Sequence, residues 1–180
     1  MWMLHNLGGF HCFCGEIMVL RDYQRKIIEL YLEQELLIAS LYALFAGKCP
    51  LHKDFWDSMV SEEREHAAWI QHFLDGIEQN KVFFSEGKTR SYTINTSIAY
   101  IKRIIMEFDN KPFDSTKALI IAHDLERALL EKNVFKCFDG DSPEVIRILE
   151  ILKGEQDHHI EKVGQFVLDA RESSRRAGVR

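Results

Sequence analysis

Apolar residues recur at steps of three and four along most of the chain, which is the spacing of one buried face of an α-helix. One such stretch runs from Asp22 to Ala46 without proline or glycine, and Gly47 and Pro50 follow it as a stop signal. A second stretch runs from about His52 to Gln79. The pattern therefore predicts two long helices joined by a short turn.

The segment that follows predicts a long connection. Residues 80–92 contain Asn80, Ser85, Gly87 and Ser91 and are expected to form a loop, whereas residues 93–108 regain a helical apolar spacing. We expect a shorter helix there.

The last third of the chain predicts two more long helices, over about residues 115–135 and from Pro143 to about Ala170. Asp114 or Ser115 is the expected cap of the first, and Ser142 is the expected N-cap of the second. Short loops join the long helices in pairs, while roughly 35 residues separate the second from the third, as in bundles with one long crossover. The prediction is an all-α, antiparallel four-helix bundle whose long crossover contains a short extra helix.

Length and composition indicate one globular domain. The 180 residues are enough for one buried core, and we divide them into an N-terminal extension (1–20), the bundle (21–170) and a basic, flexible tail (171–180). The net charge of −5 argues against a nucleic-acid partner. No apolar run approaches the ~20 residues that cross a bilayer, and residues 1–20 hold no Lys or Arg for a signal peptide, so we expect a cytoplasmic protein and no membrane partner.

The cysteines do not form a recognisable zinc or rubredoxin-type pattern. Cys12, Cys14, Cys49 and Cys137 show no CxxC pair. We expect reduced thiols, and the His11-Cys12-Phe-Cys14 segment offers too few ligands for a metal site.

Acidic and histidine side chains interrupt the apolar stripe of each long helix. The inward positions that we predict are Glu35, Glu63, His66, Glu126, Glu155 and His158. The neighbouring acids Glu29, Glu33, Glu62 and Glu65 fall outside the stripes, and His159 is expected to be exposed.

Burying four ionised carboxylates near one another is costly unless cations neutralise them. Glu and His three residues apart lie on one helix face, and this motif occurs twice, as Glu63-Arg-Glu-His66 and as Glu155-Gln-Asp-His158. An oxygen-rich site with two imidazoles favours iron, or else manganese, over zinc. The six residues therefore predict a site for two metal ions, with Asp124 and Asp157 as candidates to orient the imidazoles.

The four helices and the paired motifs resemble the ferritin-like superfamily over residues 22–170, and most closely its rubrerythrin-related branch. Glu35 followed one heptad later by Tyr42 is similar to the first helix of rubrerythrins. The resemblance implies two half-sites, with Glu63, Glu155 or both bridging the ions. One half-site would be Glu35, Glu63 and His66, and the other Glu126, Glu155 and His158.

The resemblance implies a di-iron oxidoreductase that acts on dioxygen, peroxide or ferrous iron, as a peroxidase or ferroxidase. The chain departs from rubrerythrins at Leu129, where they carry a further carboxylate, and in having no CxxC pair after the last helix. An electron donor would therefore be a separate protein. Two alternatives are an iron-binding or storage protein without turnover, and a bundle whose polar stripe contacts a partner. The apolar extension favours a homodimer.

Overall fold

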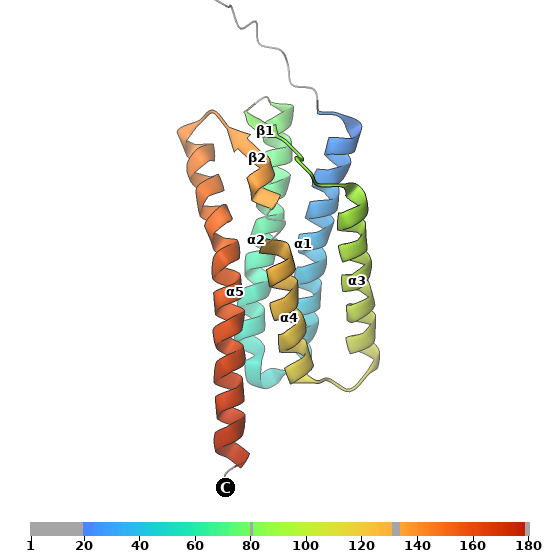
Figure 1. Cartoon of the computed structure of the whole chain (residues 1–180), viewed down its shortest axis with the longest axis vertical. Coiled ribbons are helices and arrows are strands. Elements are labelled where there is room, and N and C mark those ends of the chain that lie inside the picture. Colours follow the sequence, from blue (N-terminus) through green and yellow to red (C-terminus); the bar gives the residue numbers. More distant parts are fainter. Residues whose placement is uncertain (1–19, 80, 131–133, 179–180) are drawn as a thin grey trace, which may run out of the picture.

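The computed structural model describes residues 20–79, 81–130 and 134–178. Within these residues the protein is mostly helical and belongs to the all-α class, with helices that lie side by side and one small sheet at one end (Figure 1). The elements are α1 (Asp22–Lys48), α2 (Lys53–Glu78), β1 (Val82–Phe84), α3 (Ser91–Asn110), α4 (Ser115–Leu130), β2 (Phe138–Gly140) and α5 (Pro143–Gly178), with 3₁₀ turns at Pro50–His52 and Val134–Cys137.

The predicted starts of the last two long helices are confirmed by their capping hydrogen bonds. The Oδ1 atom of Asp114 accepts a hydrogen bond from the amide of Lys117 at 3.0 Å, at the start of α4. The hydroxyl of Ser142 accepts one from the amide of Val145 at 3.1 Å, at the start of α5. Both bonds satisfy backbone donors that a helix N-terminus leaves free.

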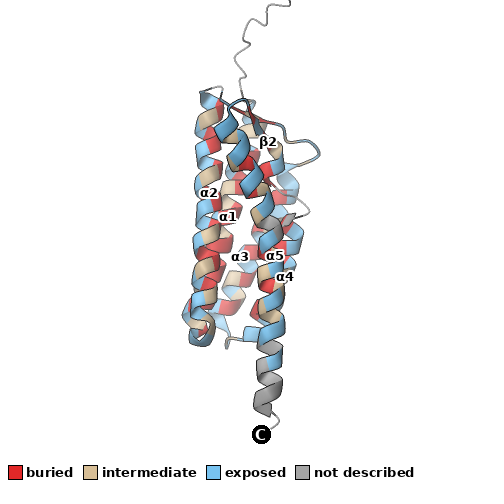
Figure 2. Cartoon of the chain, turned by 90° about the vertical axis from the view of Figure 1, so that its left-hand side faces the viewer, coloured by how far each residue is buried: buried red, intermediate tan, exposed pale blue. Residues whose placement is uncertain are grey.

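Helices α1 and α2 form an antiparallel hairpin, and α3 packs on the outer side of α1, while α4 packs against α5 (Figure 1). Figure 2 shows that buried residues gather on the faces that the helices turn toward one another. Each of the helices described, α3 included, thereby buries one face.

The buried apolar residues form two clusters at different heights of the bundle. The hairpin-end cluster lies toward the α1–α2 turn and includes Tyr42, Phe45 and Trp56. The sheet-end cluster lies toward the strands and includes Ile28 and Phe73. On α1, α2 and α5 the residues between the clusters are at positions 32–37, 61–69 and 153–162, so a polar layer at this height would have apolar packing on both sides.

The third long helix is shorter than predicted, because Val134–Cys137 form a 3₁₀ turn where the helix was expected to continue to residue 135, and α4 is described as far as Leu130. Phe135 and Phe138 belong to the sheet-end cluster, and β2 pairs antiparallel with β1. These strands were not predicted. Burial of the two aromatic side chains and the hydrogen bonds between the strands stabilise this conformation in place of the backbone hydrogen bonds of a continued helix.

Helix α5 is longer than predicted and continues to Gly178, past the expected end near Ala170 (Figure 1). No proline interrupts residues 144–178, so the backbone has no local reason to stop earlier. Predictions for residues 1–19, including Cys12 and Cys14, lie outside the described residues, whereas Cys49 and Cys137 are free thiols as predicted. Among the helices described, none is both long and apolar enough to cross a membrane.

Candidate metal site

Five ionisable side chains from four helices are buried in one layer between the two apolar clusters. They are Glu35 on α1, Glu63 and His66 on α2, Glu126 on α4 and His159 on α5, and each is at most 3% exposed. The inward orientation predicted for the first four is confirmed. Such groups are almost never fully buried unless they are paired or bind a cation.

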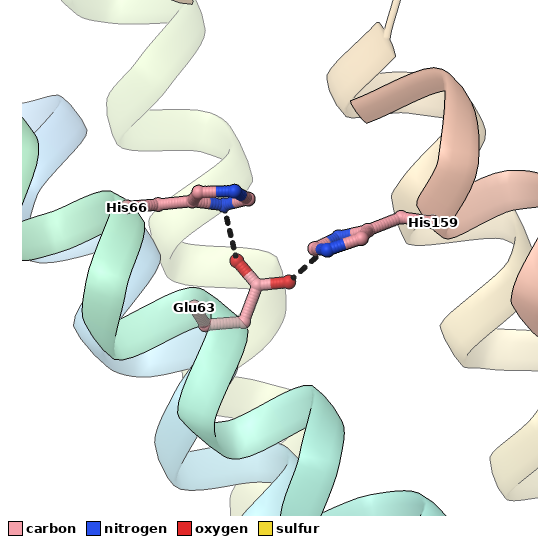
Figure 3. A group of neighbouring side chains, drawn as sticks. All are labelled: Glu63, His66 and His159. Atoms are coloured by element: carbon pink, nitrogen blue, oxygen red, sulfur yellow. Dashed lines mark ion pairs between the residues drawn. The ribbon is translucent and has the colours of Figure 1, made fainter. Parts of the chain in front are cut away.

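The carboxylate of Glu63 lies between two imidazoles that come from different helices (Figure 3). Its Oε1 atom is 3.3 Å from Nδ1 of His159, and its Oε2 atom is 3.5 Å from Nδ1 of His66. One ligand atom from each of the three residues lies within 4.8 Å of the others. The three side chains therefore converge closely enough to share a cation.

Each imidazole also faces a second buried carboxylate through the same nitrogen. Nδ1 of His66 is 3.8 Å from Oε2 of Glu35, and Nδ1 of His159 is 3.5 Å from Oε2 of Glu126. The layer thus has two similar halves, one on each side of Glu63.

The other nitrogen of each imidazole faces a carboxylate on the opposite helix. Nε2 of His159 is 2.9 Å from Oε2 of Glu62, and Nε2 of His66 is 3.5 Å from Oε2 of Glu155. The side chains of Glu62 and Glu155 are 33% and 44% exposed. These two carboxylates therefore form the solvent-facing edge of the site.

Tyr42 connects the site to the hairpin-end cluster. Its hydroxyl donates a hydrogen bond to Oε1 of Glu126 at 2.5 Å, and both side chains are buried. Its ring packs against Trp56, with 5.6 Å between the ring centroids. Burial raises the pKa of Tyr42 far above its usual range, and the charge of Glu126 adds to this effect, so the hydroxyl keeps its proton and acts as a donor.

The charges of the layer depend on one another. Burial lowers the pKa of His66, but Glu35 and Glu63 outweigh it and raise this pKa to about 10. Burial likewise opposes the protonation of His159, but Glu126, Glu62 and Glu63 raise its pKa to about 12. Without metal, the imidazoles of His66 and His159 are therefore protonated on both nitrogens, and their positive charges offset those of the carboxylates. A metal cation could replace the additional protons.

The Glu63 carboxylate provides a test of whether a cation fits. Burial alone would raise the pKa of Glu63, but His159 and His66 outweigh it and hold the pKa below its ordinary value, so the group is ionised. Its buried Oε1 atom nevertheless has no hydrogen bond of acceptable geometry from any described residue. This oxygen faces Nδ1 of His159 at 3.3 Å as an ion pair without hydrogen-bond geometry, and a metal ion is a partner that would fit beside it.

The orientation predicted for the two adjacent histidines is wrong. His158, predicted to face inward, is exposed and lines a surface hollow, whereas His159, predicted to be exposed, is 3% exposed and lies in the polar layer. The buried residues Leu149, Leu152 and Val163 define the inward stripe of α5, and His159 lies on it. The apolar residues at 163, 166 and 167 stand four, seven and eight positions after 159, and this signal in the sequence identifies the correct histidine.

The remaining predicted roles have mixed outcomes. Glu155 reaches the layer, although only from its half-exposed edge. Glu62 was expected to lie outside the site, yet it contacts His159. Asp124 is exposed and contacts His123 rather than a buried imidazole, and the side chain of Asp157 lies outside the described part of the chain.

Comparisons with protein-family models, curated proteins and solved structures give no match to this chain.

Proposed function

We propose that the polar layer binds two metal ions, with iron as the metal that suits it best, and that the protein is a ferritin-like oxidoreductase acting on dioxygen, peroxide or ferrous iron. One observation carries the proposal. The buried carboxylate of Glu63 lies between the imidazoles of His66 and His159, and each imidazole is backed by a further buried carboxylate. A carboxylate in this position can offer one oxygen to each of two cations.

The donor set supports iron, with manganese as the alternative. Three buried carboxylates, two imidazoles and the half-exposed Glu155 make the site rich in oxygen, which favours these metals over zinc. Inward carboxylates from two helices, together with Glu and His from each of two others, are the set found in ferritin-like two-metal bundles. Here α5 supplies the second pair as Glu155 and His159, four residues apart rather than three.

Bound iron would supply electrons to dioxygen or peroxide by changing between its ferrous and ferric states. The protein's own contribution is to hold the ligands and to exclude water. The apolar clusters on both sides of the layer provide the exclusion, and Tyr42 keeps one oxygen of Glu126 hydrogen-bonded. Our proposal includes a separate electron donor protein that restores the ferrous state.

Metal stoichiometry tests this proposal. The purified chain is loaded with ferrous iron under anaerobic conditions, free iron is removed, and bound iron is measured per chain. We expect two ions, and oxidation of the loaded protein by dioxygen or peroxide with absorbance changes that excess reductant reverses. Fewer than one iron per chain would refute the proposal, and loading far above two would indicate storage instead.

The two adjacent histidines provide a matched pair of variants. His159→Ala should bind at most one iron per chain, because it removes an imidazole that faces Glu63 at 3.3 Å. His158→Ala should still bind two, since that side chain is exposed on the outer face of α5. Circular dichroism verifies that both variants fold. The reverse pattern, with loss of iron only in His158→Ala, would overturn the ligand assignment.

A further inference from the structure

Glu62 precedes the central carboxylate of Glu63 by one residue and meets the other nitrogen of the same imidazole, that of His159. Its Oε2 atom is 2.9 Å from Nε2 of His159, and its Oε1 atom pairs with the ammonium group of Lys162. His159 and Lys162 are three residues apart on α5, so they lie on one helix face and meet the same carboxylate of α2. Glu62 thus links the imidazole of His159 to the ammonium group of Lys162.

The two nitrogens of His159 therefore have separate surroundings. Nδ1 faces the buried carboxylates of Glu63 and Glu126 at 3.3 and 3.5 Å, where a metal ion would lie. Nε2 faces Glu62, which is one-third exposed and lies on the other side of the ring. An imidazole can bind a metal only through a nitrogen without a proton, and a carboxylate that accepts a hydrogen bond from the other nitrogen fixes which one is free.

We infer that Glu62 is a positioning residue: its carboxylate accepts a hydrogen bond from the Nε2–H group of His159 and thereby leaves Nδ1 as the metal-binding nitrogen. The inference rests on the proposed metal site and adds to it a residue beyond the six predicted ligands. Lys162 holds the carboxylate of Glu62 in place from its other oxygen. Partners of this kind usually change metal affinity by about 10- to 100-fold when they are removed.

Glu62→Ala and Glu62→Gln are compared with Glu65→Ala. Glu65 is an exposed glutamate on the same helix, so its variant controls for the loss of one acidic charge from α2. Affinity is measured by competition with a chelator, using ferrous iron and zinc separately. The protonation of each imidazole nitrogen is measured by long-range proton–nitrogen NMR on ¹⁵N-labelled protein, both zinc-loaded and metal-free, with His159→Gln as the assignment reference.

In the wild type with zinc, we expect the metal on Nδ1 of His159 and a proton on Nε2. Glu62→Ala should weaken binding about 10- to 100-fold and alter the His159 nitrogen signals. Glu62→Gln should fall between Glu62→Ala and the wild type, because its amide oxygen can still accept the hydrogen bond. Glu65→Ala should match the wild type in both measurements.

Metal bound through Nε2 in the wild type, or Glu62→Ala with unchanged affinity and unchanged nitrogen signals, would overturn the inference. The metal-free spectra separate it from the proposed function. If the wild type binds neither metal, the proposed function fails. Even then, Glu62 would be shown to position the ring if the Nε2 proton of His159 is protected from exchange with solvent in the wild type and exchanges rapidly in Glu62→Ala.

Discussion

The hydrogen bond from Tyr42 to Glu126 gives a quantitative test of how the site is supported. Tyr42→Phe removes the hydroxyl and keeps the ring that packs against Phe45 and Trp56. The lost contact is a 2.5 Å bond between two buried groups, and no solvent can replace it. The experiment uses protein treated with a chelator, so that metal binding does not contribute.

The expected cost follows from the chemistry of the acceptor. Hydrogen bonds to charged groups contribute about 1.5–3 kcal/mol, and a buried carboxylate that loses its donor keeps its desolvation cost. We therefore expect Tyr42→Phe to lower the free energy of unfolding by about 2 kcal/mol. For a chain of this length that corresponds to a fall in Tm of about 4–8 °C.

Urea denaturation and thermal melting followed by circular dichroism measure this difference. Tyr92→Phe is the control, because Tyr92 is 79% exposed, and it should stay within about 0.5 kcal/mol of the wild type. Glu126→Gln completes a double-mutant cycle, in which Tyr42→Phe should cost about 1 kcal/mol less because the acceptor is uncharged. A cost below about 0.5 kcal/mol for Tyr42→Phe, or additive effects in the cycle, would refute the hydrogen bond as a source of stability.

Three further predictions concern the scaffold. Gly154→Ala should stabilise the protein by about 0.5–1 kcal/mol, because Gly154 lies inside a helix and the new methyl group meets no atom within 4 Å. Gly140→Ala should destabilise the protein by about 1–3 kcal/mol, because its methyl group would lie 2.5 Å from Cγ1 of Val145, and urea titrations that reverse this order would contradict the packing. Ser142→Ala removes the N-cap of α5 and should cost about 1 kcal/mol in the same assay, and an unchanged midpoint would contradict the capping role. Burial raises the pKa of the Cys137 thiol, so at pH 8 iodoacetamide should modify this thiol more slowly in the folded chain than in urea. Mass spectrometry of the Cys137 peptide measures the two rates, and equal rates would contradict the burial of the thiol.

The sequence predicts the helices best where local signals define them. Helices α1, α2 and α3 are within two residues of their predicted bounds, because apolar periodicity and clear stop signals coincide there. The early end of α4 could not be predicted in this way. Phe135 and Phe138 are three residues apart, a spacing that also suits a helix, and their actual conformation depends on pairing with a strand more than fifty residues earlier.

The limited reach of local sequence patterns also explains why His158 was predicted to face inward instead of His159. The prediction extended the apolar stripe of the last helix from Ile148, Ile151 and Leu152 to Glu155 and His158; Leu152 is buried, but Ile151 is 50% exposed. An isoleucine on a helix surface is common, so a stripe deduced from one side of a motif can be rotated by one residue. Glu62 was missed for a related reason. Its role depends on the facing helix α5, and no pattern within α2 contains that information.

The surroundings of the polar layer favour a metal site over a purely structural network. Each helix that supplies a buried ionisable side chain to the layer packs apolar residues close to it, so the layer is held in place without any ion. Burying these charges costs stability relative to an apolar layer, and a structural network would offset that cost by satisfying every polar atom. Oε1 of Glu63 instead has an ion-pair contact with Nδ1 of His159 but no hydrogen bond of acceptable geometry. A cation beside this oxygen would satisfy it and take up the carboxylate charge that the imidazole protons now offset.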